Sequence, residues 1–135
     1  MRYGVTVTGL LVLCSCSTSK DVAIAKQATE AFHRQAWAGR ADAIYDSADW
    51  AYQQTTSREA NRGFLSRIRR KMGDCHDSGM RNYFANFSTN ATYVTLGYRT
   101  KCVNGELNER LTWRTDGVRP TLVRYEANSA LLLTD

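Results

Sequence analysis

The chain lacks several features that would narrow its function directly. Its longest apolar stretch, Tyr3–Leu13, is too short to cross a bilayer as a helix. It contains one proline, Pro120, and two histidines, with no internal repeat and no low-complexity block. A membrane-spanning helix, a repeat architecture and a Pro-rich linker are therefore not expected. The 135 residues, 43% hydrophobic and 23% charged, are typical of a single globular domain with a modest core.

The N-terminus predicts an export signal, because the charged pair Met1-Arg2 precedes the short apolar run. The following residues, Leu13-Cys14-Ser15-Cys16, resemble a bacterial lipobox. This resemblance implies a lipoprotein signal peptide over residues 1–15 and lipidation of Cys16. A frame ending at Cys14 fits less well, since bulky Leu13 would precede the cysteine. An ordinary secretory signal that happens to contain cysteines is the alternative.

The lipobox interpretation sets the domain boundaries and the location. Residues 16–20 form a lipidated polar tether, and residues 21–135 form one domain. Ser17, rather than Asp, follows Cys16, which resembles the outer-membrane default of Gram-negative lipoproteins. We therefore expect a membrane-anchored protein on the inner leaflet of the outer membrane, facing the periplasm.

Two cysteines remain in the predicted domain, Cys75 and Cys102. An even pair in an oxidising compartment predicts a disulfide, which would stabilise the fold by about 3 to 4 kcal/mol. Metal binding is the alternative, because His76 and Asp77 follow Cys75 directly. Adjacent residues rarely converge on one ion and no second cluster exists, so we expect no metal and no cofactor.

The formal net charge of +5 favours anionic partners. In the envelope these are anionic lipid, an anionic polymer or an acidic protein surface, and nucleic acid is not expected there. The sequence does not indicate an oligomeric state.

Helical periodicity dominates the first half of the domain. Residues 21–37 place Ala25, Ala28, Phe32 and Ala36 on one face, with Asp21 as the expected cap and Gly39 at the end. A short helix is expected from Asp42. Thr56-Ser57-Arg58-Glu59 matches a capping box, followed by the apolar stripe Phe64, Ile68 and Met72 and by Gly73 as a C-cap.

A period of two follows Cys75. Strands are expected over residues 80–87 and 91–103, the second with Val94, Leu96, Tyr98 and Cys102 on one face. A two-residue turn at Asn104-Gly105 predicts that Cys102 lies opposite Leu107, Tyr98 opposite Leu111, Leu96 opposite Trp113 and Arg99 opposite Arg110. The Cys75–Cys102 disulfide fits this register, because Cys75 follows a helix end.

The last strand has two possible registers after Asp116-Gly117. A two-residue loop turns Leu122 and Arg124 inward. A type I turn with Gly117 in a bulge turns Val123, Tyr125 and Ala127 inward, and it is preferred because it buries more apolar surface.

Helices followed by antiparallel strands predict an α+β fold, with the N-terminal helices packed on one face of a curved sheet of about four strands. The segments beginning AFHRQAW, SREANRG and YVTLGYRT resemble uncharacterised bacterial lipoproteins with a cystatin-like, ketosteroid-isomerase-like cone fold. The resemblance rests on Trp37, Gly73, Glu109-x-x-x-Trp113, and Asp116-Gly117 ahead of Tyr125. It implies the fold and carries little about activity.

Candidate chemistry is sparse. Glu109 and Trp113 face inward by parity and could line a pocket beneath the sheet, where a desolvated carboxylate could act as a base. No second acid or histidine is placed to complete a relay, so a structural or pocket-polar role is expected. His33 is expected to pack at the surface or near the helix end, and His76 to be a loop residue.

The outer face of the sheet is the best lead for partner binding. By parity it carries Tyr93, Arg99, Lys101, Arg110, Arg114 and Arg124, with Glu126 as the lone nearby acid. A solvated face is the simpler interpretation. The leading functional hypothesis is a non-catalytic, lipid-anchored periplasmic binding module that engages an envelope protein or polymer, for example in immunity, secretion support or phage exclusion. The alternative is a small-ligand carrier or isomerase-like enzyme that uses Glu109.

Overall fold

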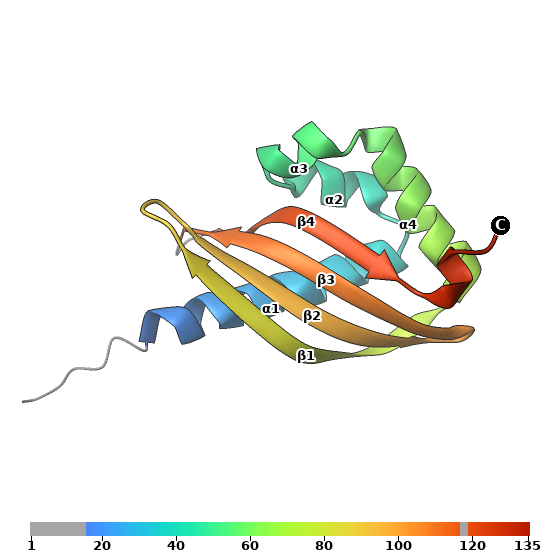
Figure 1. The fold of residues 1–135 in the computed structure, drawn as a ribbon. Coiled ribbons are helices and arrows are strands. Elements are labelled where there is room, and N and C mark those ends of the chain that lie inside the picture. The colour runs from blue at the N-terminus through green and yellow to red at the C-terminus, as the bar shows by residue number, and fades with distance from the viewer. Residues whose placement is uncertain (1–15, 117–118) are drawn as a thin grey trace, which may run out of the picture.

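The computed structural model describes residues 16–116 and 119–135 and confirms the predicted α+β class. Four helices precede four antiparallel strands, which form a curved open sheet in the order β1-β2-β3-β4. The elements are α1 (Cys16–Trp37), α2 (Ala41–Ser47), α3 (Trp50–Thr55), α4 (Arg58–Met72), β1 (Cys75–Phe87), β2 (Thr92–Cys102), β3 (Gly105–Thr115), β4 (Thr121–Asn128) and the 3-10 turn η1 (Ala130–Leu132). In Figure 1, α1 crosses one face of the sheet, and the other helices lie beyond β4.

The first helix is longer than the sequence predicts. It begins at Cys16, so the stretch predicted as a tether is helical. Asp21 is not a cap but is buried, and its carboxylate accepts a hydrogen bond from the Thr115 hydroxyl at 2.9 Å. The predicted apolar stripe does face the sheet, since Ala25, Phe32 and Ala36 are buried. The predicted signal peptide, residues 1–15, lies outside the described residues.

The fourth helix has both ends defined by local chemistry. Its N-cap is Ser57, not the predicted Thr56, because the Ser57 side chain accepts the Ala60 N–H at 3.0 Å. Gly73 ends the helix with φ +73° and ψ −159°, a backbone region that is essentially restricted to glycine. Buried Asn61 then joins the helices: its amide donates to the Ala41 carbonyl and its oxygen accepts the Tyr52 hydroxyl.

The β2–β3 register differs from the predicted one by two residues. The turn residues are Val103 and Asn104, and Gly105 pairs with Cys102. The described partners are Thr100 with Leu107, Tyr98 with Glu109, Leu96 with Leu111, Val94 with Trp113, Arg99 with Asn108 and Gly97 with Arg110. A two-residue shift keeps every side chain on its predicted face. The predicted juxtaposition of Arg99 and Arg110, however, is wrong.

Tertiary hydrogen bonds explain this turn. The Val103 N–H donates to the Asp74 carbonyl at 2.9 Å, and the Asn104 N–H donates to the Met72 carbonyl at 3.0 Å. Met72 is the last residue of α4 and Asp74 lies two residues beyond it, so the turn gives a partner to the last helix carbonyl and to one just after the helix. A prediction of the turn from the two strands alone does not include these hydrogen bonds to the carbonyls of Met72 and Asp74.

The last strand follows the preferred register with one correction. Tyr125 and Ala127 face inward, as the bulged turn predicts, and they lie opposite Leu111 and Glu109. The register shift falls between Thr112 and Trp113, and it brings Leu122 rather than Val123 opposite Trp113 and into the core. The turn that was expected to hold the bulge includes residues 117 and 118, which lie outside the described residues.

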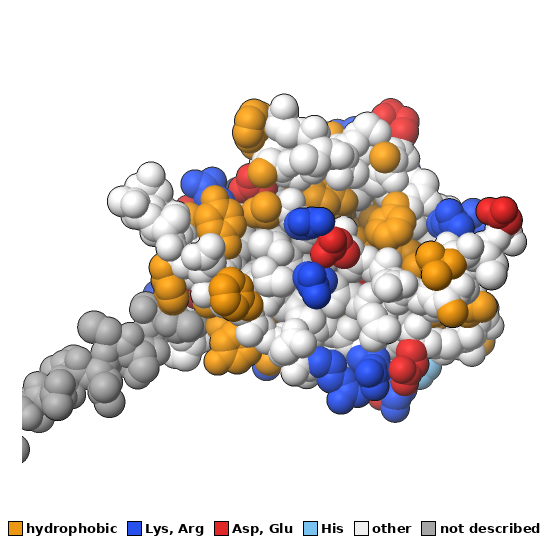
Figure 2. All heavy atoms as spheres, in the orientation of Figure 1, with side chains coloured by type: hydrophobic (Ala, Val, Ile, Leu, Met, Phe, Trp, Pro, Cys, Tyr) orange, Lys and Arg blue, Asp and Glu red, His pale blue; other side chains and the backbone are white. Residues whose placement is uncertain are grey.

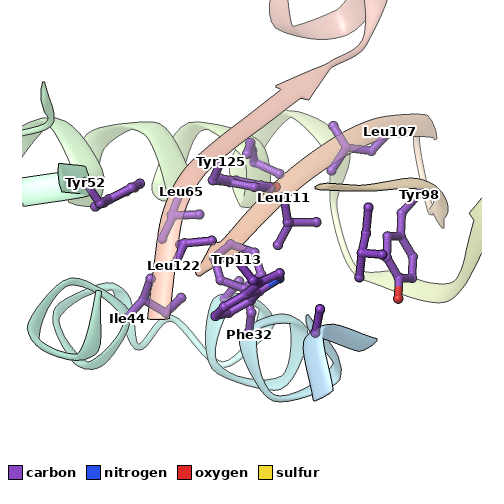
Figure 3. Packing of buried hydrophobic residues seen from close by; sticks show 14 of the residues in the cluster. Phe32, Ile44, Tyr52, Leu65, Tyr98, Leu107, Leu111, Trp113, Leu122 and Tyr125 are labelled. Carbon is purple, nitrogen blue, oxygen red and sulfur yellow. The ribbon is translucent and has the colours of Figure 1, made fainter. Parts of the chain in front are cut away.

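The core fills the space between α1, α2, α4 and the inner sheet face. Figure 3 shows Trp113 beside Phe32, with Leu111 and Tyr125 on the strands above them. Ile68, Met72, Leu96, Leu107 and Leu111 are the largest completely buried aliphatic side chains. Trp50 lies outside this core and is exposed at the start of α3.

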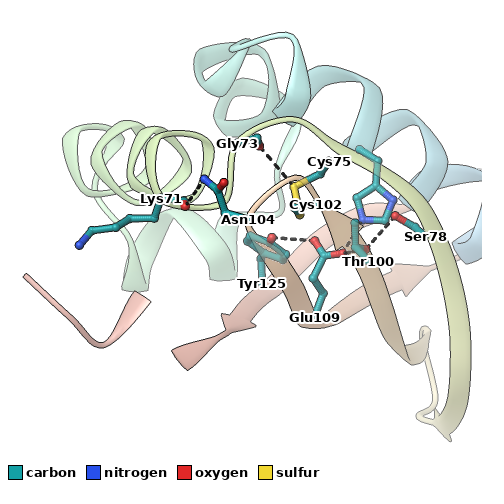
Figure 4. The surroundings of a disulfide bond; sticks show 10 residues. Lys71, Gly73, Cys75, Ser78, Thr100, Cys102, Asn104, Glu109 and Tyr125 are labelled. Carbon is teal, nitrogen blue, oxygen red and sulfur yellow. Dashed lines mark hydrogen bonds and ion pairs between the residues drawn. A yellow bond between two sulfur atoms is a disulfide. The ribbon is translucent and has the colours of Figure 1, made fainter. Parts of the chain in front are cut away.

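The predicted disulfide is confirmed. Cys75 and Cys102 are bonded and lie opposite each other in the β1–β2 ladder, next to the end of α4 (Figure 4). The first strand begins at Cys75 rather than at Met80, and the bond ties this beginning to the last residue of β2.

Candidate functional site

Glu109 lies in the interior of the protein, between the sheet and α1. Its side chain is 0% exposed. One carboxylate oxygen, Oε1, accepts the Tyr125 hydroxyl at 2.8 Å, and the other, Oε2, accepts the Thr100 hydroxyl (Figure 4). The Ser78 hydroxyl lies 2.8 Å from that of Thr100 and donates to it, because the Thr100 proton is already engaged by Glu109.

His33 is the partner that the sequence analysis missed. It does not pack at the surface but is buried, and its Nε2 lies 3.0 Å from Glu109 Oε2. A carboxylate only accepts hydrogen bonds, so His33 Nε2 carries the proton in this contact. The imidazole ring stacks on Trp37, with ring centroids 5.5 Å apart, and meets Tyr98 edge-on. These aromatic contacts hold the ring at the carboxylate.

Three buried side-chain hydrogen bonds join α1 to β3, and we call them together the seam. One of them is the contact between His33 and Glu109. Asp21 bonds Thr115, and the Trp113 indole N–H donates to the Thr29 hydroxyl at 2.9 Å. The helix residues of the seam, Asp21, Thr29 and His33, belong with Ala25 to one stripe of four-residue steps. The four-residue spacing is visible in the sequence, but a buried face predicted from apolar residues alone does not include Asp21, Thr29 and His33.

The seam is fully hydrogen-bonded. Among the described residues, no buried side-chain nitrogen or oxygen lacks a partner. Burial, and after it the negative charge of Glu109, raises the pKa of Tyr125 well above its usual value. Tyr125 therefore remains a protonated donor to Glu109 at neutral pH. Three donors, from His33, Thr100 and Tyr125, thus bond the carboxylate in the interior, and these hydrogen bonds stabilise the fold.

The inner-face pocket expected around Glu109 and Trp113 is not a shared cavity. Trp113 lines a hollow of about 280 Å³ between α1, α2 and the beginning of β4, and Glu109 does not border it. The floor of this hollow is apolar, formed by Phe32, Ile44 and Leu122. The structure therefore separates the two residues that the sequence analysis assigned to one pocket.

The outer sheet face carries the predicted basic residues, and all five cations are exposed. Glu126 is not their lone acid, because each cation lies within 4 Å of a carboxylate. The pairs are Arg99–Glu106, Lys101–Asp77, Arg110–Glu126, Arg114–Asp49 and Arg124–Glu126, at 3.6, 3.8, 3.9, 3.7 and 2.8 Å. Tyr93 is half-buried. Arg99 and Arg110, which the predicted register places opposite each other, instead each lie near a carboxylate. Ion pairs at an exposed surface contribute little to stability.

The outer face is nevertheless hollowed. Two adjoining hollows of about 750 and 410 Å³ share Asn82, Arg110 and Glu126, and we call them together the outer-face groove. The charged side chains that line it are those of exposed Arg81, Arg99, Arg110 and Arg124 and of half-buried Glu126. Glu109 borders the larger hollow with its backbone only, because its side chain is 0% exposed. Figure 2 shows this face, with basic and acidic side chains next to each other near the middle, surrounded by white surface, and with hydrophobic side chains gathered on the left, where β1 ends and β2 begins. Gly97 also lines the groove, and the Asn82 side chain occupies the space that a Cβ at Gly97 would need.

Basic residues at the end of α4 have a structural role. The Arg67 guanidinium donates to the Leu132 carbonyl at 2.7 Å, and the Lys71 ammonium donates to the Thr134 carbonyl. They hold the C-terminal segment against α4.

Comparison with known proteins gives no relative: no family model matches the chain, and no curated protein matches it. Within residues 16–116 and 119–135, no three His, Cys, Asp or Glu side chains converge as a metal site would require. None of the described helices is long and apolar enough to cross a membrane.

Proposed function

We propose that this protein is a lipid-anchored periplasmic binding module, without catalytic activity, that engages an acidic envelope protein through the outer-face groove. The observation that carries the proposal is the contrast between the two sheet faces. The only candidate catalytic acid from the sequence, Glu109, is enclosed in the core, whereas the opposite face offers a broad solvent-filled groove.

The charges of the groove favour an acidic partner. Arg110 and Arg124 share a single carboxylate, Glu126, and Arg81 forms no ion pair with any described residue. Arginine forms paired, planar hydrogen bonds with carboxylates, and the amides of Asn82, Asn108 and Asn128 add neutral donors and acceptors. Such a surface attracts an acidic partner and orients it.

Charge reversal tests the groove. The lipidated Arg99→Glu/Arg110→Glu protein should recover less of its cross-linked partner from native envelopes than wild type, with slower and less salt-sensitive association. The matched control is Arg40→Glu/Arg70→Glu, which makes the same change in charge at two exposed positions outside the groove, the N-cap of α2 and the last turn of α4. Equal recovery by both double variants would contradict the groove as the binding site. Recovery of an anionic polymer in place of a protein would contradict the partner class.

The anchor is tested separately at Cys16. Cys16→Ser should leave a folded protein that no longer needs detergent for extraction from the membrane fraction, because the lipid would have no attachment site. Detergent-dependent extraction that persists in this variant would contradict the lipoprotein proposal without affecting the proposal for the groove.

A further inference from the structure

The first strand is an edge strand with little protection. No described residue pairs with its outer side, since the sheet order begins with β1. Edge strands in natural proteins are usually blunted by charge, proline or bulges. Register shifts interrupt β1 between His76 and Ser78 and between Met80 and Asn82, but the ladder from Asn82 to Phe87 is continuous. That stretch, NYFANF, contains neither proline nor a charged residue.

The opposite edge shows the contrast. The last strand follows Pro120 and carries Arg124 and Glu126, which form an ion pair at 2.8 Å. It also packs against α3, and the Thr121 hydroxyl donates to Asp49 at 2.7 Å. Charge and a covering helix therefore protect β4, as expected for an edge that binds no further strand.

Exposed aromatic side chains flank the regular part of β1 on both faces. Phe84 is opposite Thr95 on the outer face and is 67% exposed. Tyr83 and Phe87 are on the inner face, the side of buried Leu96, but are 55% and 56% exposed. Three large aromatic residues exposed on one six-residue segment indicate an interaction surface.

We propose that the free edge of Asn82–Phe87 binds an extended segment of a partner protein as a fifth antiparallel or parallel strand. The backbone groups of the edge would supply the hydrogen bonds, and Tyr83, Phe84 and Phe87 would contact alternate apolar side chains of the segment on both faces. The inference goes beyond the outer-face groove, because it concerns the edge of the sheet.

Charge identifies the segment as acidic and disfavours a second copy of this chain. Arg81 is exposed just before the regular stretch and has no ion-pair partner among the described residues. A carboxylate on the added strand would form an ion pair with it. A symmetric dimer could pair β1 of one copy with β1 of the other along the whole strand. Because Arg81 is the central residue of Cys75–Phe87, the two Arg81 side chains would then lie next to each other, and their like charges would repel. The net charge of +5 on each copy adds to that repulsion.

A random-peptide display selection on the purified protein tests this proposal. Recovered peptides should alternate apolar and polar residues and contain Asp or Glu. Their binding should protect from hydrogen exchange the amides within Asn82–Phe87 that point away from β2, which are every second one along the strand. Phe87→Lys places a lysine on the edge and should weaken binding about tenfold or more, as loss of a central aromatic contact does.

Val103→Lys is the matched control, because it replaces another exposed apolar residue with lysine at the far β2–β3 turn and should leave binding unchanged. Arg81→Glu should shift the selected peptides from acidic to basic. The proposal is overturned if selection enriches no peptide, if protection maps to the groove or elsewhere, or if the protein self-associates through β1. Asn82, Tyr83 and Phe84 also line the groove, whereas Ala85, Asn86 and Phe87 do not. Exchange at the last three residues therefore distinguishes the edge from the groove, and either site can fail without the other.

Discussion

His33 Nε2 and Glu109 Oε2 lie 3.0 Å apart in the interior, joining the first helix to the third strand across 76 residues of sequence. The carboxylate holds the imidazole of His33 and the hydroxyls of Thr100 and Tyr125 together. It is thus the point at which α1, β2, β3 and β4 are joined by side-chain hydrogen bonds.

Removing this carboxylate should be costly. Glu109→Gln replaces one acceptor oxygen by an amide donor, which leaves buried donors facing each other. We expect the free energy of unfolding to fall by about 3 kcal/mol, as when one partner of a buried pair is lost. Urea unfolding followed by circular dichroism measures it. Glu106→Gln, at an exposed acid on the same strand, should change stability by less than about 0.5 kcal/mol. Similar values for both variants would mean that the seam contributes little.

Two glycines of one segment should respond oppositely to alanine. Gly63 lies in the exposed interior of α4 with nothing within 4 Å of an added Cβ, so Gly63→Ala should raise stability by about 0.5 to 1 kcal/mol. Gly73 has φ +73°, and an added Cβ would lie 3.2 Å from the Val103 side chain. Gly73→Ala should therefore lower stability by about 1 to 3 kcal/mol. Denaturant midpoints that move in the same direction for both variants would contradict the assigned helix end.

The disulfide closes the β1–β2 hairpin over a sequence separation of 27. Replacing Cys75 and Cys102 by alanine together should lower the free energy of unfolding by about 3 to 4 kcal/mol, because the unfolded chain gains freedom. Urea curves of the oxidised wild type and the double variant give the difference. Wild-type protein that reacts with a thiol reagent at both positions without prior reduction would show that the bond is not formed.

Alkaline pH should destabilise the protein through its buried tyrosines. Burial raises the pKa of Tyr52 to about 12, and the pKa values of Tyr98 and Tyr125 are raised for the same first reason. In the unfolded chain the pKa of a tyrosine is about 10. Between these values the unfolded chain holds fewer protons than the native protein, so stability falls as the pH rises from 10 to 12.

Ultraviolet titration of the tyrosines tests this assignment. Tyr52→Phe should remove a component that titrates near pH 12. It should also leave a smaller loss of stability over the same pH range. A titration curve that Tyr52→Phe leaves unchanged above pH 11 would contradict the burial of that hydroxyl.

The sequence by itself determined which faces of the first helix and of the second strand are buried. Apolar residues at steps of three and four placed Ala25, Phe32 and Ala36 on the buried side of α1, and alternation placed Val94, Leu96 and Tyr98 on the inner sheet face. Both follow from the periods of helix and strand, which are local properties of the backbone. The sequence also predicts the Cys75–Cys102 disulfide, because the predicted domain contains one pair of cysteines. Alternation places Cys102 on the inner sheet face, and Cys75 follows a helix end.

Only the tertiary structure decided the pairings. The β2–β3 turn moved by one position toward the N-terminus, to Val103-Asn104, because carbonyls at the end of α4 accept its N–H groups. His33 turned inward because Glu109, distant in sequence, offers a buried acceptor. The ion pairs of Arg99 with Glu106 and of Arg110 with Glu126 likewise depend on which strand residues come to lie side by side. Periodicity assigns a residue to a face, but a partner from another element decides the hydrogen bonds and charges that it meets there.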